Sequence, residues 1–346
     1  MQQTTFKQLQ SPLADQIKVN GRQYLYFGGT AYLGIPQKQE FLAHYVKGIS
    51  FFGLNNGTSR GNNVQLGIYD EAEAYAATMF GAEAAFVTSS GYLAAQLAVK
   101  NLADWGKVSY APNTHPALWL NQKQNHNGSF SDWATAIVNE INSSKTQKWV
   151  LISNSMNNLF PERYDFSFVE KLNKKVVLIV DDSHGVGINN NGKGVFGEIP
   201  QPDNVEVLVV ASMAKALGVD AGLILGSQKT IAFLKQSPEF FGASPPSAAG
   251  LYAFMQSGNI YQQQLKALNN NCDLLEKRLV QKSDWHFIPN YPVFLGKNAE
   301  LSNKLLKQDI LISSFPYPNS NSEIINRIVL SSWHTIADIN KLAIHL

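Results

Sequence analysis

Short apolar runs recur through the first two thirds of the chain, with stretches of helical spacing between them. The clearest run is Val176–Val180, which is typical of a strand buried on both faces of a sheet. The predicted strands are residues 84–90, 107–111, 148–153, 175–181 and 205–211. The predicted helices are residues 36–50, 68–80, 93–103, 163–173, 228–240 and 246–280, the last two around a Pro-Pro break. Strands that alternate with helices predict a mainly parallel sheet in a three-layer α/β arrangement.

The two ends of the chain have a different pattern. Residues 16–34 alternate between polar and apolar around Asn20-Gly21, which predicts a small hairpin. From about residue 283 onward, short strands and helices alternate in another rhythm, which predicts a C-terminal α+β domain. The predicted organisation is an N-terminal segment (1–35), a large domain (36–245) and a small domain (246–346).

Composition narrows the class of protein. The chain has 346 residues, 45% hydrophobic and 16% charged, which is ordinary globular composition. A net charge of +2, with no basic cluster among aromatic residues, argues against nucleic-acid binding. The single cysteine, Cys272, excludes an intrachain disulfide and fits a reducing compartment. Because no signal-like or membrane-spanning apolar run is present, we expect a cytoplasmic protein with no membrane partner.

Polar residues follow the predicted strands at the ends where open α/β sheets bind ligands. Asp181 and Asp182 end one strand, and His184 follows in a glycine-rich turn. Lys215 lies in a loop of small residues after the next strand, where desolvation lowers an amine's pKa and makes it nucleophilic. Each residue alone has an ordinary alternative: a surface lysine, a turn or helix-cap acid, a structural histidine. An acid and a lysine at two strand ends together suggest pyridoxal phosphate, whose ring needs a charged nitrogen.

Two further segments fit such a cofactor. Residues 88–96 form a strand–Ser–Gly–helix junction, and free N–H groups at a helix start bind phosphate. Ser212, three residues before Lys215, can donate a hydrogen bond to the same phosphate. His115 follows another strand, and its ring can stack on a planar cofactor, with a loop histidine as the alternative.

The order of these segments resembles the α-oxoamine synthases, which are fold-type-I pyridoxal phosphate enzymes. The matching segments are GTSRG (57–61), TSSGYLAAQ (88–96), THPA (114–117), VDDSHGVG (180–187), GKG (192–194), SMAKALGVDAG (212–222), PP (245–246) and RIVLSSWH (327–334). The resemblance covers roughly residues 22–340. It implies an aspartate-aminotransferase-like fold, with a three-layer α/β/α large domain and a smaller C-terminal α+β domain. It also implies pyridoxal 5′-phosphate as the cofactor, and no metal.

The resemblance also implies roles for single residues. Lys215 binds the cofactor covalently, Asp181 pairs with its pyridine nitrogen, and His184 pairs with its phenolic oxygen. His115 stacks on one face of the ring, whereas Asp182 remains a turn acid. The other implied cofactor contacts are Ser90, Gly91, Tyr92 and Ser212 at the phosphate, Asn158 near the ring, and Ser244, which reaches across a homodimer with shared active sites.

Three positions depart from the family pattern. Thr30 replaces an asparagine that helps to hold the substrate carboxylate. Ser314 stands where an arginine pairs with that carboxylate, and serine cannot imitate a bidentate contact. Arg327 lies nearby but aligns with a strand residue, so we do not expect it to take over this role. Ser183 replaces an alanine on the ring face opposite His115.

These features leave three functional hypotheses. The first is decarboxylating condensation of an amino acid with an acyl-CoA. The second is amino transfer, or another pyridoxal phosphate reaction, on an amine that lacks the usual α-carboxylate contact. The third is a non-enzymatic protein that binds the cofactor or a partner, which the retention of Lys215, Asp181 and His184 disfavours.

Overall fold

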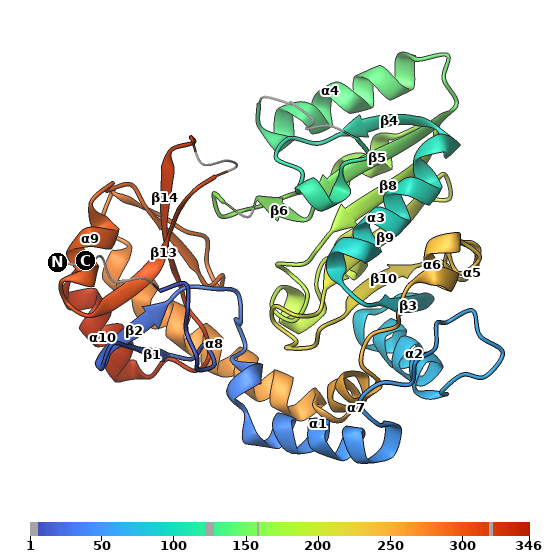
Figure 1. Ribbon diagram of the computed structural model, residues 1–346. Coiled ribbons are helices and arrows are strands. Elements are labelled where there is room, and N and C mark those ends of the chain that lie inside the picture. Colours follow the sequence, from blue (N-terminus) through green and yellow to red (C-terminus); the bar gives the residue numbers. More distant parts are fainter. Residues whose placement is uncertain (1–5, 122–127, 158, 318–320) are drawn as a thin grey trace. The chain divides into compact units, whose positions relative to one another are not determined.

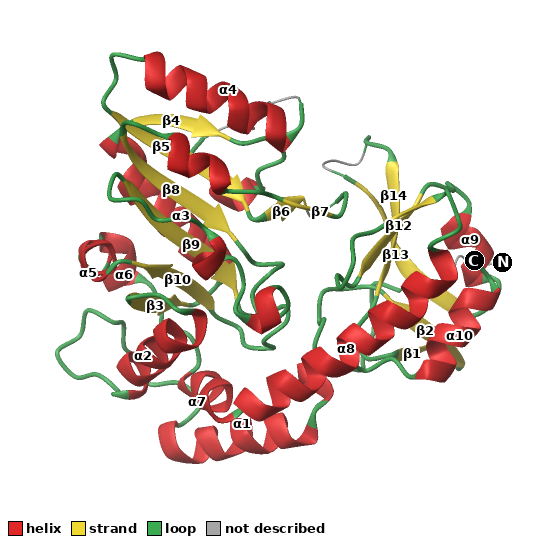
Figure 2. Cartoon of the chain, turned by 180° about the vertical axis from the view of Figure 1, so that it is seen from behind, coloured by secondary structure: helices red, strands yellow, loops and turns green. Residues whose placement is uncertain are grey.

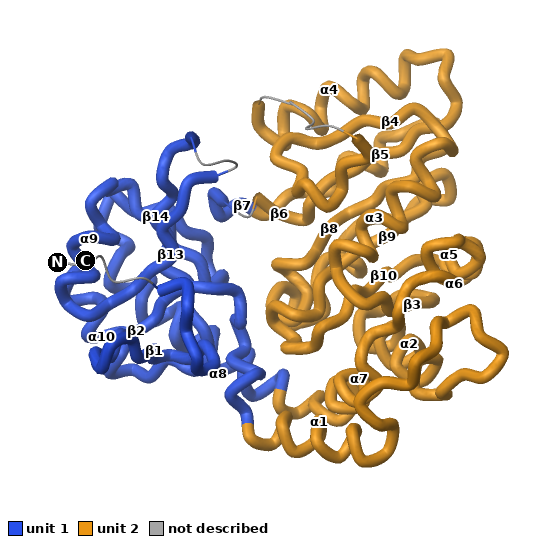
Figure 3. Tube along the Cα trace, in the orientation of Figure 1, with its two compact units in different colours: residues 1–38, 158–162, 261–346 blue, residues 39–157, 163–260 orange. Residues whose placement is uncertain are grey.

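The computed structural model describes residues 6–121, 128–157, 159–317 and 321–346 (Figure 1). The chain forms two compact units (Figure 3). Unit 1 comprises residues 1–38, 158–162 and 261–346, and unit 2 comprises residues 39–157 and 163–260. The N-terminal segment thus clusters with the C-terminal part of the chain. The predicted domain boundaries at residues 35 and 245 remain predictions.

Unit 2 is built on a six-stranded sheet (Figure 2). In spatial order its strands are β3 (Ala84–Thr88), β10 (Gly222–Gly226), β9 (Val205–Ser212), β8 (Lys175–Asp181), β5 (Lys148–Asn154) and β4 (Lys107–Tyr110). β4, β5, β8 and β9 pair in parallel, whereas β10 is antiparallel to both its neighbours. The predicted mainly parallel sheet is confirmed, with β10 as an unpredicted strand.

The helices of unit 2 are α1 (Gln39–Phe52), α2 (Ile68–Phe80), α3 (Gly91–Leu102), α4 (Phe130–Ser143), α5 (Gln228–Leu234), α6 (Pro238–Gly242) and α7 (Ala248–Gln256). Of these, α2, α3 and α5 pack on the sheet, whereas α1 packs on α7. Val176–Val180 of β8 are at most 4% exposed, so both faces of the sheet are covered, as the apolar run predicts. A core of apolar side chains from α3 and the central strands fills one face.

Three helix predictions are wrong in detail. The helix predicted over 228–240 is two short helices, α5 and α6, which residues 235–237 separate. Residues 163–173 contain only a 3-10 turn at Ser167–Lys171. The Asp165 carboxylate accepts hydrogen bonds from the backbone and hydroxyl of Ser167, and these local bonds compete with helix formation. The predicted helix over 246–280 is two helices, α7 and α8 (Gly258–Leu279), which are separated at Ser257.

Unit 1 contains a second six-stranded sheet. Its strands in spatial order are β1 (Gln16–Val19), β2 (Arg22–Phe27), β13 (Ile310–Pro316), β14 (Ile324–Val329), β12 (Val293–Gly296) and β11 (Trp285–His286). The predicted hairpin is confirmed, because β1 and β2 pair antiparallel around Asn20 and Gly21, both with positive φ. The remaining elements of the chain are α9 (Leu301–Leu306), α10 (Ile336–Ile344), β6 (Met156–Asn157) and β7 (Glu162–Arg163).

Candidate functional site

The predicted site residues of unit 2 lie at or just after the carboxyl ends of neighbouring strands of its sheet. Asn154 and Asp181 are register partners at the ends of β5 and β8. Ser212 is the last residue of β9, next to β8, and His115 follows β4 by five residues. The carboxyl ends of parallel strands are where open α/β sheets bind ligands, so the fold places these residues at its ordinary binding edge.

The turn after β8 closes around Asp182. The side chain of Asp182 is fully buried, and its Oδ2 accepts a hydrogen bond from the Val195 N–H at 2.8 Å. Burial raises the pKa of Asp182 to about 7, although the Ser155 hydroxyl and the Val195 N–H oppose this shift. Gly185 is required here, since a Cβ would lie 2.1 Å from Asp182 Oδ1. Asp182 therefore holds the turn that carries half-buried His184.

Asp181, Lys215 and His115 lie within electrostatic range of one another. Burial lowers the pKa of Lys215, and the Asp181 carboxylate partly offsets this change. Burial also lowers the pKa of His115. The Asp181 carboxylate acts to raise this pKa, and the Lys215 amine acts to lower it. The Asp181 Oδ1 accepts a hydrogen bond from the Ser183 N–H at 2.9 Å, which orients the carboxylate. The structure thus brings together an amine of lowered pKa, a carboxylate and an imidazole.

Sequence reasoning missed Asn154, which positions His115. Asn154 is 2% exposed, and its Oδ1 accepts a hydrogen bond from the His115 N–H at 3.0 Å. Its Nδ2 donates to the Asn113 carbonyl at 2.6 Å. The Ala117 N–H donates a hydrogen bond to His115 Nδ1 at 3.2 Å, so this ring nitrogen carries no proton. The lowered pKa of His115 also favours the neutral imidazole. The sequence feature that could have identified Asn154 is its position as a polar residue directly at the end of the buried apolar strand β5.

The N-terminus of α3 packs against the end of β9. Ser90 caps α3, and its hydroxyl accepts a hydrogen bond from the Leu93 N–H at 3.1 Å. A Cβ on Gly91 would lie 2.6 Å from Ser212 Cβ, so only glycine allows this approach. The first N–H groups of a helix point out of its N-terminus and favour anions there. Ser90, Gly91 and Ser212 therefore lie together, with exposed Tyr92 in the same helical turn.

The predicted cofactor contact Ser244 lies in another part of unit 2. Ser244 is exposed and lines a cavity of about 530 Å³ with residues 54–59, Tyr69 and residues 245–248. Asn158 lies outside the residues that the structure describes. Among the described residues, no three His, Cys, Asp or Glu side chains are placed to hold a metal ion.

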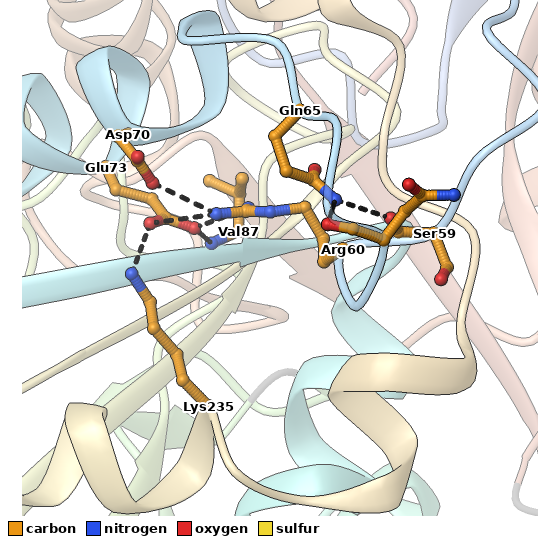
Figure 4. A network of polar contacts seen from close by, with 8 residues as sticks. Ser59, Arg60, Gln65, Asp70, Glu73, Val87 and Lys235 are labelled. Carbon is orange, nitrogen blue, oxygen red and sulfur yellow. Dashed lines mark hydrogen bonds and ion pairs between the residues drawn. The ribbon is translucent and has the colours of Figure 1, made fainter.

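A buried ion-pair network fixes the GTSRG loop of unit 2 (Figure 4). Arg60 of this loop pairs with Glu73 of α2 at 2.8 Å, and Glu73 is only 3% exposed. Glu73 also pairs with Lys235 at 2.5 Å and accepts a hydrogen bond from the Val87 N–H at 3.1 Å. The Arg60 guanidinium lies 5.1 Å from the centre of the Phe240 ring. The network therefore ties the loop to α2, β3 and α6.

Within unit 1, the register of β13 and β14 decides which residues share a face. Ser313 is opposite Arg327, and Ser314 is opposite Asn326. The Gly29 N–H donates to Ser313 Oγ at 3.4 Å, beside Thr30. Because directly opposed residues share a face, Ser313 and Arg327 lie on the side of Gly29, whereas exposed Ser314 lies on the other.

Arg327 is a buried cation among aromatic rings. It is 9% exposed, and its guanidinium lies 5.3 Å from the centre of the Phe315 ring. Its charge acts on Tyr32 and Tyr317, where it opposes the rise in pKa that burial causes. Such a cation suits a carboxylate.

Comparisons with known proteins agree with this fold. A family model described as aminotransferase class I and II matches residues 56–346. An 8-amino-7-oxononanoate synthase of Herminiimonas arsenicoxydans is 24% identical in an alignment of 363 positions that covers 96% of this chain and 92% of the relative.

Two solved structures share the fold. The serine palmitoyltransferase of Sphingomonas wittichii has a TM-score of 0.81 at 17% identity, covering 99% of this chain and 90% of its own. The 8-amino-7-oxononanoate synthase of Francisella tularensis has a TM-score of 0.73 at 18% identity, covering 93% and 96%. The predicted fold class and the predicted resemblance are confirmed. Along the described stretches, no helix combines the length and apolar character that a membrane crossing requires.

Proposed function

Because the chain belongs to the aminotransferase class I and II family, whose members use pyridoxal phosphate, we propose that it is an acyltransferase of the α-oxoamine synthase type. It would join the α-carbon of an amino acid to the acyl group of an acyl-CoA, with release of CO₂ and CoA. Similarity to an 8-amino-7-oxononanoate synthase over 96% of the chain supports this proposal. The observation that carries it is the grouping of Lys215, Asp181 and His115 at the strand ends.

The residues of unit 2 fit pyridoxal phosphate. Lys215 offers a half-buried amine of lowered pKa for the covalent bond, and Asp181 offers a carboxylate for the ring nitrogen. His115 offers a neutral ring held by Asn154, and His184 a polar group for the phenolic oxygen. The close approach of Gly91 to Ser212 leaves a helix N-terminus for the phosphate. When bound, the cofactor withdraws electrons from the carbon next to the substrate amine.

Lys215 is the base that this proposal uses for proton transfer. Burial lowers the pKa of this amine and so favours its uncharged form, which can accept a proton on Nζ and return it. The same amine would hold the cofactor covalently. The Asp181 carboxylate would face the charged ring nitrogen, and the hydrogen bond from the Ser183 N–H holds that carboxylate in place.

The alignment alone did not favour Arg327 for the substrate carboxylate, but its register and burial lead us to propose it for this role, in place of the contact expected near Ser314. It shares a strand face with Ser313, whose hydroxyl accepts a hydrogen bond from the Gly29 N–H, and its charge is buried. An Arg327→Lys variant keeps the charge but loses the planar fork, so we expect the KM for the amino acid to rise at least about tenfold. The KM for the acyl-CoA should change less than about twofold. Equal changes in both constants would contradict this role.

The decisive activity assay combines the purified chain, pyridoxal phosphate, single amino acids and acyl-CoA thioesters of different length. We expect release of free CoA thiol from the thioester and an equal amount of CO₂ for at least one pair, and no release by Lys215→Ala. A cofactor-loaded chain that releases neither product with any pair would contradict the proposal.

Amino transfer is a second candidate function, because Thr30 and Ser314 replace the residues that normally hold an α-carboxylate. An amine donor without a carboxylate needs neither contact. Incubation with such amines and a 2-oxo acid, without a thioester, distinguishes the two. Formation of the corresponding amino acid favours transfer, and its absence with every amine excludes this candidate.

The proposal includes a homodimer in which the partner's Ser244 reaches the cofactor phosphate. Exposed Ser244 on the wall of a polar cavity fits a contact with another chain. Light scattering of the holoenzyme should give twice the mass of one chain, 38.2 kDa.

A further inference from the structure

Ser183 contacts two of the proposed cofactor-binding residues at once. It is 7% exposed and lies between Asp181 and His184 in the turn after β8. Its N–H donates to Asp181 Oδ1 at 2.9 Å, and its hydroxyl accepts a hydrogen bond from the Ser212 N–H at 2.8 Å. One residue therefore joins the end of β8, through its backbone N–H, to the end of β9, through its hydroxyl.

The turn after β8 explains why Ser212 needs this hydroxyl. β8 and β9 pair in parallel, and the last regular bond runs from the Asp182 N–H to the Val210 carbonyl at 2.8 Å. In a continued ladder the Ser212 N–H would bond to the Asp182 carbonyl. That carbonyl instead accepts from Gly185 and Val186, because the chain turns there. The Ser183 hydroxyl supplies the missing acceptor for this part-buried backbone donor.

The position of Ser212 in turn sets the space in front of α3. A Cβ on Gly91 would meet Ser212 Cβ, Cα and N at 2.6 to 2.9 Å, so the two backbones are in close contact. Movement of Ser212 would therefore change both its own hydroxyl and the clearance at the helix N-terminus. These are the groups that the proposed function assigns to the cofactor phosphate.

We propose that Ser183 is a positioning residue that fixes the phosphate cradle formed by Ser212 and the N-terminus of α3. This inference rests on the proposed function. It explains a residue that departs from the family pattern, where alanine is usual and can accept no such bond. The side chain acts through Ser212, and its N–H acts on Asp181 whatever the side chain is.

The test compares two ligands that differ only in the phosphate. The full-length chain, freed of cofactor, is titrated with pyridoxal phosphate and with pyridoxal, for wild type, Ser183→Ala and Ser183→Cys. Because the part-buried Ser212 N–H loses its acceptor, Ser183→Ala should bind pyridoxal phosphate about tenfold more weakly and pyridoxal within about twofold of wild type. Ser183→Cys, whose sulfur is a weak acceptor, should lie between them.

Ser257→Ala is the matched control. It removes another buried hydroxyl, which donates to the Ala253 carbonyl at 2.6 Å in a helix turn away from these residues. It should leave both affinities unchanged. Equal weakening for both ligands, or no weakening in Ser183→Ala, would overturn the inference while the proposed function stands. Failure of the wild-type chain to bind pyridoxal phosphate would overturn both.

Discussion

Adjacent acids at the end of β8 have opposite surroundings and opposite roles. Asp181 is half-buried at the sheet edge, where its charge acts on Lys215 and His115. Asp182 is fully buried inside the turn and holds the Val195 N–H. The sequence run predicts two acids at a binding edge, but only the course of the turn decides which one faces the site.

The buried carboxyl of Asp182 gives a prediction about pH. Its pKa is raised from 3.8 to about 7, so it keeps its proton in the folded chain while the unfolded chain has lost it. This contribution to stability is complete below about pH 4 and disappears as the pH rises through about 7. Asp182→Asn cannot ionise, so its free energy of unfolding should fall less over this range, as urea titrations at several pH values would show.

Exposed Asp284 provides the control for this prediction. Asp284→Asn should keep the wild-type pH dependence of unfolding. The account of Asp182 is wrong when Asp182→Asn and wild type lose stability in parallel between about pH 4 and pH 7.

At the scale of elements, the local pattern predicts the strands best where burial is continuous. β8 and β9 were predicted almost to the residue, because apolar runs buried on both faces leave little choice. β10 was missed, because its five residues, GLILG, follow directly on a loop of small residues. The helix predicted over 163–173 failed because the Asp165 side chain takes the local hydrogen bonds.

The junction between α3 and β9 depends on glycine. Gly91→Ala would place a Cβ against backbone atoms of Ser212, so α3 or β9 must shift. We expect about 1–3 kcal/mol lower stability and at least about tenfold weaker binding of pyridoxal phosphate, measured by urea unfolding and by titration. Gly197→Ala is the control, since its Cβ would meet nothing within 4 Å. Indistinguishable behaviour of the two variants would refute this view of the junction.

The ion-pair network of the GTSRG loop predicts a stability effect. Glu73→Gln leaves Arg60, whose side chain is 8% exposed, without its buried counter-charge. We expect a loss of about 3 kcal/mol in the free energy of unfolding, because a broken buried pair leaves an uncompensated charge. Urea denaturation measures this loss. Glu71→Gln, at an exposed position of the same helix, should change stability by less than about 0.5 kcal/mol, and equal losses would count against the network.

At the scale of the whole molecule, the sequence predicts the fold more completely than the site. The order of the motif segments along the chain indicates the family, and the comparisons with known proteins confirm both the family and the fold. The contacts that hold the site are formed between distant segments, such as Asn154 with His115 and Ser183 with Ser212. The strand register that puts Arg327 opposite Ser313 is likewise a pairing property, which no local pattern encodes.

The central claim is that Lys215 is the lysine that binds pyridoxal phosphate. Borohydride reduction of the cofactor-loaded chain fixes the lysine–cofactor bond, and peptide mass spectrometry then locates it. We predict the added pyridoxyl phosphate mass on the peptide that contains Lys215, and none in Lys215→Ala. A label on another lysine, or an unlabelled wild-type chain, would contradict the account.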